Sequence, residues 1–565
     1  MIRKILLPLL LVAVVVCISS CSSKLKPLAG EYIKATPQPL ELSAGKVPVT
    51  INATFPAKWF NKKATVVVTP VLKYDGGEAW GTSYTFQGEK VAGNGQVIPQ
   101  SSGANVTMTS SFDYVPAMAK SELYLSFDAK IGNKTVELPD LKIGDGVLAT
   151  AGLVDAGSEA PAIAPDKFQR IIKEAYDANI MFMIQQAQLR ANELNKGEVI
   201  DWKDLVKNAD EAPNQNVAVE ISAYASPDGG LELNEKLAAQ REQNTNAYLA
   251  KEFKSKKVDV PISARYTAQD WEGFKQLVEK SNLQDKDLVL RVLSMYTDPE
   301  RREQEIKNIS AVYSSLADDI LPQLRRSRLT ANIEIIGKSD EEISSLAASN
   351  PKGLTVEELL YAATLVNSSS EKDAIYKKAS EIYPRDARAF NNLGVLAYEK
   401  GNVAGAETLF NKALQTANGN LPEANCNLGF IALTKGDKAK AAQYLGNAAG
   451  VKELSNATGI LDILNGDYSK AVSSFGNTGS NNAALAQILA KDYNKANSTL
   501  NAVANPNATT SYLKAIVASR TNNLSGVTSN LQQAISKDRS LASKALTDLE
   551  FVKYITNSEF LNVVK

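Results

Sequence analysis

The chain has 565 residues, and its 62 Lys and Arg balance 62 Asp and Glu, so the formal net charge is zero. This length predicts three or four domains. The balanced charge gives no excess of positive charge of the kind that binds nucleic acid. Histidine is absent, which excludes His-based triads, His metal ligands and the commonest general base. We therefore predict a protein that is not an enzyme and uses no cofactor and no metal. A hydrolase that works through two carboxylates is the alternative left open.

The first twenty residues have the layout of a secretory signal peptide. A basic start, Met1 to Lys4, precedes an apolar run, Ile5 to Ile18, that is too short for a comfortable membrane span. Small residues and Cys21 follow, and this ending resembles a bacterial lipobox. The resemblance implies removal of residues 1–20 and lipid attachment to Cys21, which would anchor the mature chain in the outer membrane. No acidic cluster follows Cys21, which favours the periplasmic face. The alternative is an ordinary secreted protein with an incidental Cys21.

Three segments follow that differ in pattern. Residues 21–45 carry three prolines and are predicted to form an extended tether. Over residues 46–150, apolar residues alternate, as in Val47 to Ile51, and glycine pairs supply turns, so this part is predicted to be an antiparallel β-sandwich. Residues 151–167 are small, proline-bearing and unpatterned, which predicts a linker.

The stretch from Val217 to Leu249 has the clearest local pattern in the chain. An alternating apolar segment, Val217 to Ala223, leads into the turn sequence Ser226-Pro227-Asp228-Gly229-Gly230. A helical pattern follows, with Leu237, Arg241 and Tyr248 on it. The order therefore predicts a strand, a tight turn and a helix.

This stretch resembles the OmpA-like C-terminal domain, which ties Gram-negative outer-membrane proteins to peptidoglycan. Tyr224, Asn234, Leu237 and Arg241 match its pattern, whereas Ser226 stands at the position of its Asp. In the family an Asp receives the ammonium of diaminopimelate and an Arg grips its carboxylate with two hydrogen bonds. The resemblance implies four candidate ligands for peptidoglycan: Ser226, Asp228, Asn234 and Arg241.

The resemblance covers residues 168–338 and implies an α/β domain. Between its third and last strands, residues 270–323 form a long insert with apolar residues at spacings of three and four, which predicts two or three helices. The insert is either a docking surface or an elaborated core, because both have the same pattern. The polar residues 339–353 are predicted to be a second linker.

Residues 354–565 are predicted to form an all-α solenoid. Leu393-Gly394 and the Gly and two Ala after it recur 35 residues later, starting at Leu428-Gly429, with Leu445 at the position of Phe410. This resembles the tetratricopeptide repeat, in which stacked helix pairs offer a concave surface to partner proteins. An inner-helix Asn can hold an extended backbone through both ends of its amide, although these positions are equally consistent with solvated polar residues. The candidate partner-binding residues are Asn391, Asn392, Tyr398, Asn425 and Asn427.

Two functions are consistent with this multidomain α+β organisation, which resembles outer-membrane lipoproteins of the Bacteroidetes kind. The first is a scaffold or tether in an envelope protein assembly, with partner proteins at the repeats. The second is a lipoprotein that links the outer membrane to peptidoglycan. An Arg241 and an Asp228 that face one exposed pocket would favour the second function, and a closed Arg241 would favour the first.

Overall fold

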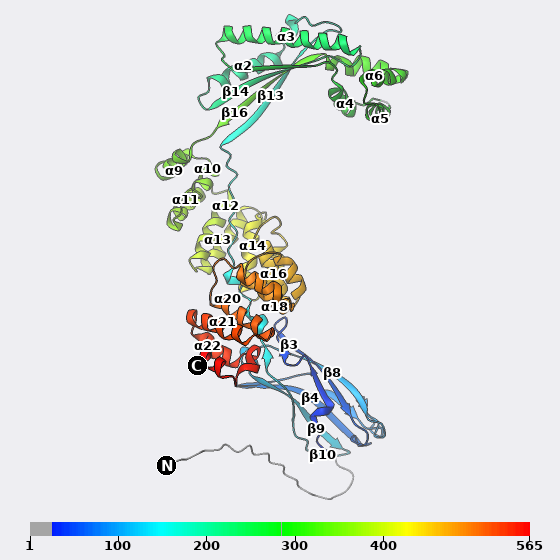
Figure 1. Cartoon of the computed structure of the whole chain (residues 1–565), viewed down its shortest axis with the longest axis vertical. Coiled ribbons are helices and arrows are strands. Elements are labelled where there is room, and N and C mark those ends of the chain that lie inside the picture. Colours follow the sequence, from blue (N-terminus) through cyan, green and yellow to red (C-terminus); the bar gives the residue numbers. More distant parts are fainter. Residues whose placement is uncertain (1–24, 284) are drawn as a thin grey trace. The chain divides into compact units, whose positions relative to one another are not determined.

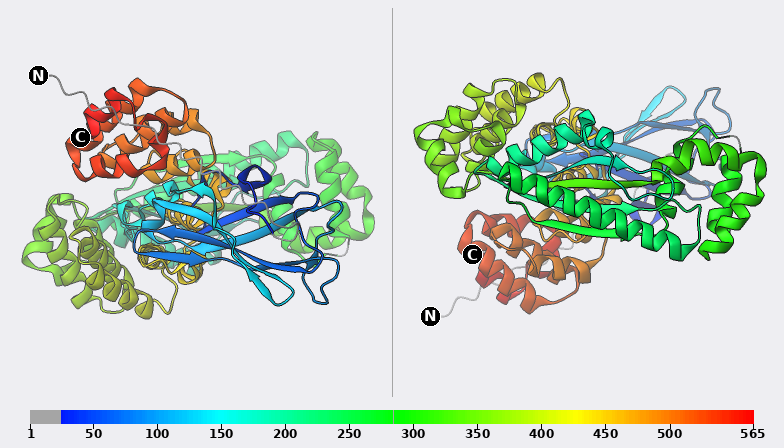
Figure 2. Two further views of the ribbon diagram at one scale, coloured as in Figure 1. Left: turned by 90° about the horizontal axis from the view of Figure 1, so that it is seen from below. Right: turned by 90° about the horizontal axis from the view of Figure 1, so that it is seen from above.

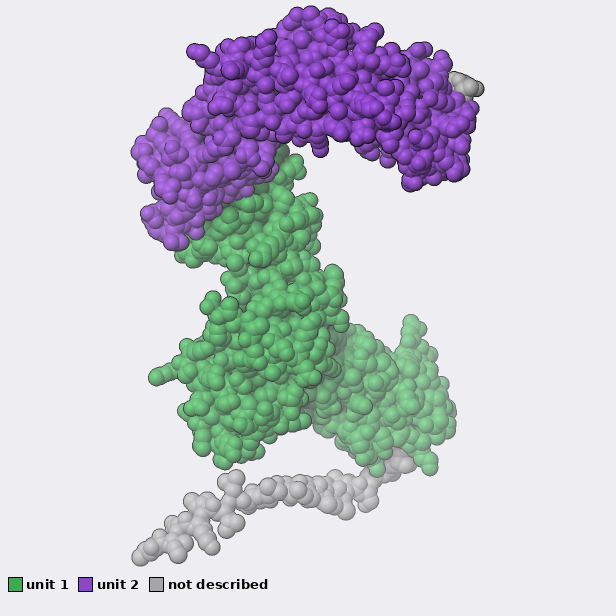
Figure 3. Space-filling view, turned by 45° about the horizontal axis from the view of Figure 1, so that its top comes forward, with its two compact units in different colours: residues 1–165, 380–565 green, residues 166–379 purple. Residues whose placement is uncertain are grey.

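The computed structural model describes residues 25–283 and 285–565, so the predicted signal peptide and the lipidation at Cys21 lie outside the described residues. The fold is mixed α/β and divides into two compact units, which Figure 3 colours separately. The first unit combines Met1–Pro165 with Ser380–Lys565, and the second is Asp166–Ala379. Among the described residues, no helix combines the length and apolar character needed to cross a membrane.

The N-terminal part of the first unit contains two sheets. The smaller has the order β1-β3-β8, and the larger has the order β10-β9-β4-β6-β7 with β11 on β9 and β5 on β4 (Figure 1). A short parallel pair, β2 with β12, stands beside them. The strands are β1 (Ile33–Thr36), β2 (Leu40–Glu41), β3 (Lys46–Phe55), β4 (Ala64–Tyr74), β5 (Gly77–Trp80), β6 (Tyr84–Gln87), β7 (Gln96–Val97), β8 (Ala104–Asp113), β9 (Ser121–Ile131), β10 (Lys134–Val136), β11 (Leu141–Asp145) and β12 (Val147–Leu148).

Both sheets bury their apolar faces in one core. Alternate residues of β3 point inward, among them Val47 and Ile51, and they share a cluster with Val66 and Val68 of β4. Such a shared core is how two sheets pack face to face.

The tether predicted for residues 21–45 is corrected by the structure over its described part. Leu25 and Leu28 are buried in the core of the two sheets, and β1 pairs with β3 in antiparallel register. The prolines in this stretch therefore interrupt a packed segment rather than extend a free one, because burial of the apolar residues around them outweighs their bias toward open chain.

The second unit is built on a four-stranded sheet with the order β13-β16-β14-β15. β15 runs parallel to β14, while β16 is antiparallel to both β13 and β14. The strands are β13 (Ile171–Met181), β14 (Gln215–Tyr224), β15 (Ile262–Thr267) and β16 (Arg326–Ile336), and the helices that accompany them are α1 (Ala191–Leu194), α2 (Gly197–Glu211) and α3 (Leu231–Lys256). Apolar residues of α2 and α3 share one core with the sheet, and the right view of Figure 2 shows α3 lying across the strands.

The insert forms a helical cluster with its own core. Its elements are α4 (Trp271–Lys280), α5 (Lys286–Met295), α6 (Pro299–Asn308), α7 (Ser310–Ser315), the π-helical turn Leu316–Ile320 and α8 (Leu321–Leu324). Phe274, Val289, Ile306 and Leu316 pack against one another in this core. The insert helices thus bury their apolar faces against one another, as expected for an elaborated core.

The linker predicted for residues 339–353 is instead largely a helix, α9 (Asp340–Ser349). Ser339 and Glu342 form a capping box at its start, and Ile343 and Ala347 are buried along it. The cap satisfies amides that a helix start leaves open, which is why this polar stretch folds. α10 (Val356–Ala362) and α11 (Ser369–Ile382) follow, and the boundary between the two compact units falls within α11 rather than at residue 354.

From residue 387 onward the chain forms helix pairs. They are α12 (Ala387–Glu399) with α13 (Val403–Thr416), α14 (Pro422–Thr434) with α15 (Lys438–Leu445), α16 (Leu454–Asn465) with α17 (Tyr468–Phe475), α18 (Asn481–Leu489) with α19 (Tyr493–Asn501), and α20 (Ala508–Arg520) with α21 (Leu524–Lys537). α22 (Ser540–Thr547), a 3₁₀ segment (Leu549–Tyr554) and α23 (Ser558–Val564) close the array, with Phe551 and Phe560 buried.

Glycine allows the two helices of a pair to approach closely. A Cβ added to Gly394 would lie 2.6 Å from the Phe410 ring, and one added to Gly459 would lie 2.5 Å from the Phe475 ring. Real Cβ atoms essentially never come this close to a neighbour. Gly394 and Gly429, which are 35 residues apart in the sequence, therefore meet a steric requirement at their helix crossings, and Gly459 meets the same requirement at the next crossing.

We expect Gly459→Ala to lower the free energy of unfolding of the first unit by about 1–2 kcal/mol. The added methyl group would push against the buried Phe475 ring, and such overpacking outweighs the helix propensity of alanine. Denaturant unfolding of the full chain measures the change. Ser455→Ala, at an exposed position of the same helix, is the matched control with an expected change within about 0.5 kcal/mol. Equal stability of both variants would contradict the crossing model.

Candidate functional site

The segment that follows the sheets, residues 151–167, packs along the inner helices of the repeats and is not a free linker. It contains two short 3₁₀ turns, Thr150–Leu153 and Ala156–Ser158. Beyond them Ala162 and Ala164 are buried, whereas Ile163 and Pro165 are exposed. In Figure 1 this cyan segment runs along the yellow and orange helices. The linker predicted for residues 151–167 is thus corrected, since most of it is a bound segment of the first unit.

Three asparagines hold the backbone of this segment. Asn392 accepts from the Ala164 N–H at 2.8 Å and donates to the Ala164 carbonyl at 3.0 Å. Asn427 does the same at Ala162, at 2.6 and 2.9 Å. Asn482 repeats the pattern at Asp155, at 2.9 and 2.8 Å. We call each such two-bond contact an asparagine clamp, and we call the surface that carries them the repeat groove.

The other predicted residues of the concave face have different roles. Asn391 is buried, donates to the Ala162 carbonyl at 3.0 Å and accepts from Asn427, so it orients the neighbouring clamp. Asn425 donates to the carbonyls of Gly419 and Leu421, which closes the turn before its own helix. The Tyr398 hydroxyl has a raised pKa, because of burial first and then of the nearby Asp155 and Glu159 carboxylates.

Sequence reasoning missed Asn482 and Asn456. Asn482 lies on α18 at the position that corresponds to Asn392 and Asn427, and Asn456 lies on α16 at the position that corresponds to Asn391. The signal was present, but the repeat interval shortens after residue 448, so a fixed period of 35 does not reach them.

One acidic side chain of the bound segment enters the groove. Glu159 accepts from Asn482 at 2.8 Å and from Asn456 at 2.9 Å. Burial raises the pKa of Glu159, and the two amide donors offset only part of that effect. The repeat groove therefore holds the backbone of the bound segment at three points, with the 3₁₀ turn Ala156–Ser158 and the Glu159 carboxylate between the first and the second.

The second candidate site is the turn after β14. The Asp228 carboxylate pairs with Arg325 at 3.0 Å, accepts a hydrogen bond from the Ser226 hydroxyl and is mostly buried. Asn234 donates to the carbonyls of Ser226 and Gly229 and so fixes the shape of the turn. The charge that would receive a ligand ammonium is thus neutralised by an arginine of the chain itself.

Arg241 is fully buried beneath this turn. Its guanidinium donates to the carbonyls of Tyr224 at 2.8 Å, Gln186 at 3.0 Å and Met183 at 3.2 Å, and it lies 5.0 Å from the centre of the Phe182 ring. Burial lowers the pKa of Arg241 to about 10, and the nearby Arg325 acts in the same direction. Arg241 and Asp228 therefore do not face one exposed pocket.

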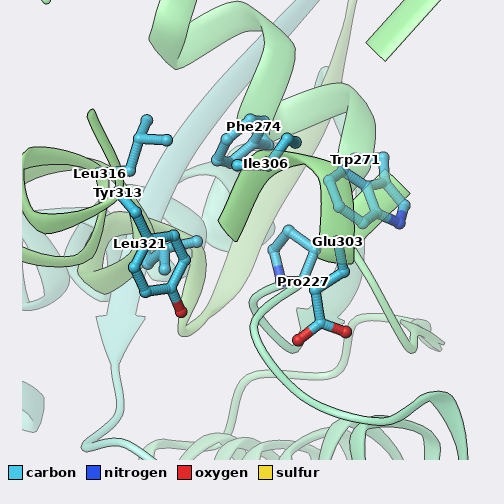
Figure 4. A pocket seen from close by; sticks show the side chains of 8 residues that line it. All are labelled: Pro227, Trp271, Phe274, Glu303, Ile306, Tyr313, Leu316 and Leu321. Atoms are coloured by element: carbon cyan, nitrogen blue, oxygen red, sulfur yellow. The ribbon is translucent and has the colours of Figure 1, made fainter. Parts of the chain in front are cut away.

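A pocket joins this turn to the insert (Figure 4). Pro227 of the turn lines it together with insert residues, which are Trp271, Phe274, Glu303, Ile306, Tyr313, Leu316 and Leu321. The Glu303 carboxylate is paired with Lys307. The lining is mainly apolar and its one carboxylate is neutralised, so the insert packs against Pro227 at the edge of the turn.

Cys426 provides a probe of the repeats. It is buried in α14, in the same cluster as Ala156 and Ala162 of the bound segment, and burial raises the pKa of its thiol to about 12. At pH 8 we expect a thiol reagent to react with Cys426 about a thousandfold more slowly in the native chain than in guanidinium chloride, because the thiolate is the reactive form. A chain that starts at residue 22 has no other cysteine, and its Cys426→Ser variant gives the blank. Rapid reaction in the native chain would contradict this burial.

In the part of the chain that the structure describes, no group of His, Cys, Asp and Glu could hold a metal ion. No protein-family model matches the chain, and no curated protein matches it.

Several solved structures resemble part of the chain at low scores. PilF of Pseudomonas aeruginosa is 18% identical, covers 38% of this chain and 98% of its own, and gives a TM-score of 0.27. A tetratricopeptide repeat protein from Parabacteroides merdae is 16% identical, with coverage of 38% and 91% and a TM-score of 0.28. YrrB, described as a tetratricopeptide protein with an unusual peptide-binding site, is 20% identical, with coverage of 37% and 100% and a TM-score of 0.22.

Identities and scores this low carry no argument about what this chain binds. The successive helix pairs of this chain, with glycines at the crossings of three of them, resemble tetratricopeptide repeats.

Proposed function

We propose that this protein is a non-enzymatic lipoprotein of the outer membrane, anchored through Cys21 and facing the periplasm, that acts as a scaffold in an envelope protein assembly. The observation that carries the proposal is the repeat groove, whose clamps hold a polypeptide through the N–H and carbonyl groups of its backbone. A membrane anchor raises the local concentration of bound partners, so modest affinity at each site is sufficient.

The anchor is tested by comparing the wild-type chain with Cys21→Ser in the cell. We expect the wild type to incorporate labelled fatty acid and to fractionate with the outer membrane, and the variant to do neither. Crosslinking of intact cells should then link the wild-type chain to envelope proteins through its repeats. A chain that is unlabelled, or that is recovered free in the periplasm, would overturn the proposal.

The alternative is a lipoprotein that links the outer membrane to peptidoglycan through Asn234 and Arg241. It is supported by the family resemblance around the turn, but a ligand would have to separate Asp228 from Arg325 and draw Arg241 away from three carbonyls. Co-sedimentation of the purified chain with sacculi separates the two functions. We expect no binding by the wild type; binding that is lost in Asp228→Asn would favour the wall-binding alternative.

A further inference from the structure

The segment that fills the repeat groove is held mainly through its backbone. The three clamps contact the N–H and carbonyl groups of Asp155, Ala162 and Ala164. Any extended chain presents such groups at the two-residue spacing of Ala162 and Ala164, whereas the 3₁₀ turn Ala156–Ser158 separates these two clamps from the clamp at Asp155. The groove is therefore not specific for this segment beyond a few side-chain positions.

Those positions define which side chains the groove accepts. Ala162 and Ala164 are almost completely buried, at 0% and 1% exposed, so larger side chains do not fit at the clamps. Ile163 between them is exposed, as alternation along an extended chain requires. Three residues before Ala162, the Glu159 carboxylate meets the amides of Asn456 and Asn482.

The fit of this segment is incomplete. The carbonyl oxygen of the Asn456 side chain is buried and has no hydrogen-bond donor among the described residues. Glu159 is half-buried, and the groups that act on its carboxylate are the amides of Asn482 and Asn456 and the like charge of Asp155. Because its buried side chains are alanines, the segment also gains little from the hydrophobic effect. The segment stays in the groove largely because it belongs to the same chain, which gives it a high effective concentration.

We propose that residues 155–164 are an intramolecular stand-in for a partner, and that the repeat groove opens to an extended, acidic segment with alanine-sized side chains at the clamps. This proposal rests on the proposed scaffold function and names the chemistry of the partner. The partner segment competes with residues 155–164 and is gripped by the same asparagines. The groove is thus closed until a partner of this kind is concentrated enough to displace the stand-in.

The test uses a release variant of the full chain, Ala162→Glu with Ala164→Glu. The added side chains cannot enter the clamps, while every residue of the groove is kept. The probe is a fluorescent peptide with the sequence of residues 153–166, LVDAGSEAPAIAPD, and its binding is followed by fluorescence polarisation. We expect the release variant to bind the peptide at least about tenfold more tightly than the wild type, because the tethered competitor is gone.

Two controls assign the binding to the groove. Adding Asn427→Ala to the release variant should weaken binding about tenfold, since one clamp is lost. A peptide with leucine at the position of Ala162 should bind more weakly than the native peptide. A folded release variant that binds no peptide, or binding that is insensitive to Asn427→Ala, would overturn the proposal.

A second measurement covers a release variant that fails to fold. Excess peptide added to the wild-type chain should increase hydrogen exchange in residues 155–165, because the displaced segment loses its protection. No increase at saturating peptide would overturn the proposal. None of these measurements depends on lipidation or cell fractionation, so this inference and the proposed envelope function can fail separately.

Discussion

Replacing Arg241 with alanine is expected to lower the free energy of unfolding of the second unit by about 3–5 kcal/mol, rather than to remove a ligand contact. Three backbone carbonyls would lose a charged donor, and the chain around a fully buried side chain would be left with a cavity. Lysine should rescue little, because it cannot supply the planar fork that reaches three acceptors. Denaturant unfolding combined with hydrogen exchange in β14 and α3 measures the effect and assigns it to this unit.

Arg265→Ala is the matched control. Arg265 lies on β15 of the same sheet, and its side chain is 67% exposed and paired with Glu220. Exposed ion pairs of this kind contribute about 0–1 kcal/mol, so the variant should unfold almost as the wild type does. If Arg241→Ala were as stable as Arg265→Ala and bound sacculi less well than the wild type, Arg241 would be a ligand residue, contrary to the structure.

The second large effect is expected at the end of the repeats. Arg520 donates to both carboxylate oxygens of Glu550, at 2.9 and 2.5 Å, and Thr150 donates to the same carboxylate. Glu550 is buried, so Arg520→Leu would leave a buried carboxylate without its cation. We expect a loss of about 3–5 kcal/mol in the stability of the first unit, again measured by denaturant unfolding.

The double variant Arg520→Leu with Glu550→Gln tests the cause. Removing both charges avoids an unpaired buried ion, so this chain should be more stable than Arg520→Leu alone. Equal losses in the single and double variants would show that packing around the Arg520 side chain, rather than its charge, accounts for the effect.

The sequence predicts those helices and strands whose packed side chains recur at regular intervals. β14 and α3 follow from the alternation of Val217 to Ala223 and from the turn residues after it. The helix pairs follow from the recurring glycines and alanines. The polarity of residues 339–353 predicts a linker, whereas the capping box of Ser339 and Glu342, which is also present in the sequence, indicates the helix α9.

The contacts of both candidate sites were less accessible to sequence reasoning. The chemistry of Asn392 and Asn427 could be inferred from residue type, but not that the backbone they hold is that of Ala162 and Ala164. A segment bound through its N–H and carbonyl groups has no side-chain periodicity. Likewise Arg241 could be placed on a helix, while two of its three acceptors, the carbonyls of Met183 and Gln186, come from a stretch outside any regular element.

The division of the first unit between the two ends of the chain constrains how the protein can mature. Its sheets and bound segment are made before residue 166, yet the helices that cover them begin after residue 380. The bound segment must therefore wait, with its backbone unprotected, until the helices that carry the asparagine clamps have been synthesised. Closing contacts across so long an insertion is slow. A chain truncated before α12 would lose its last helices and also leave residues 155–164 without a partner, open to proteolysis far from the break.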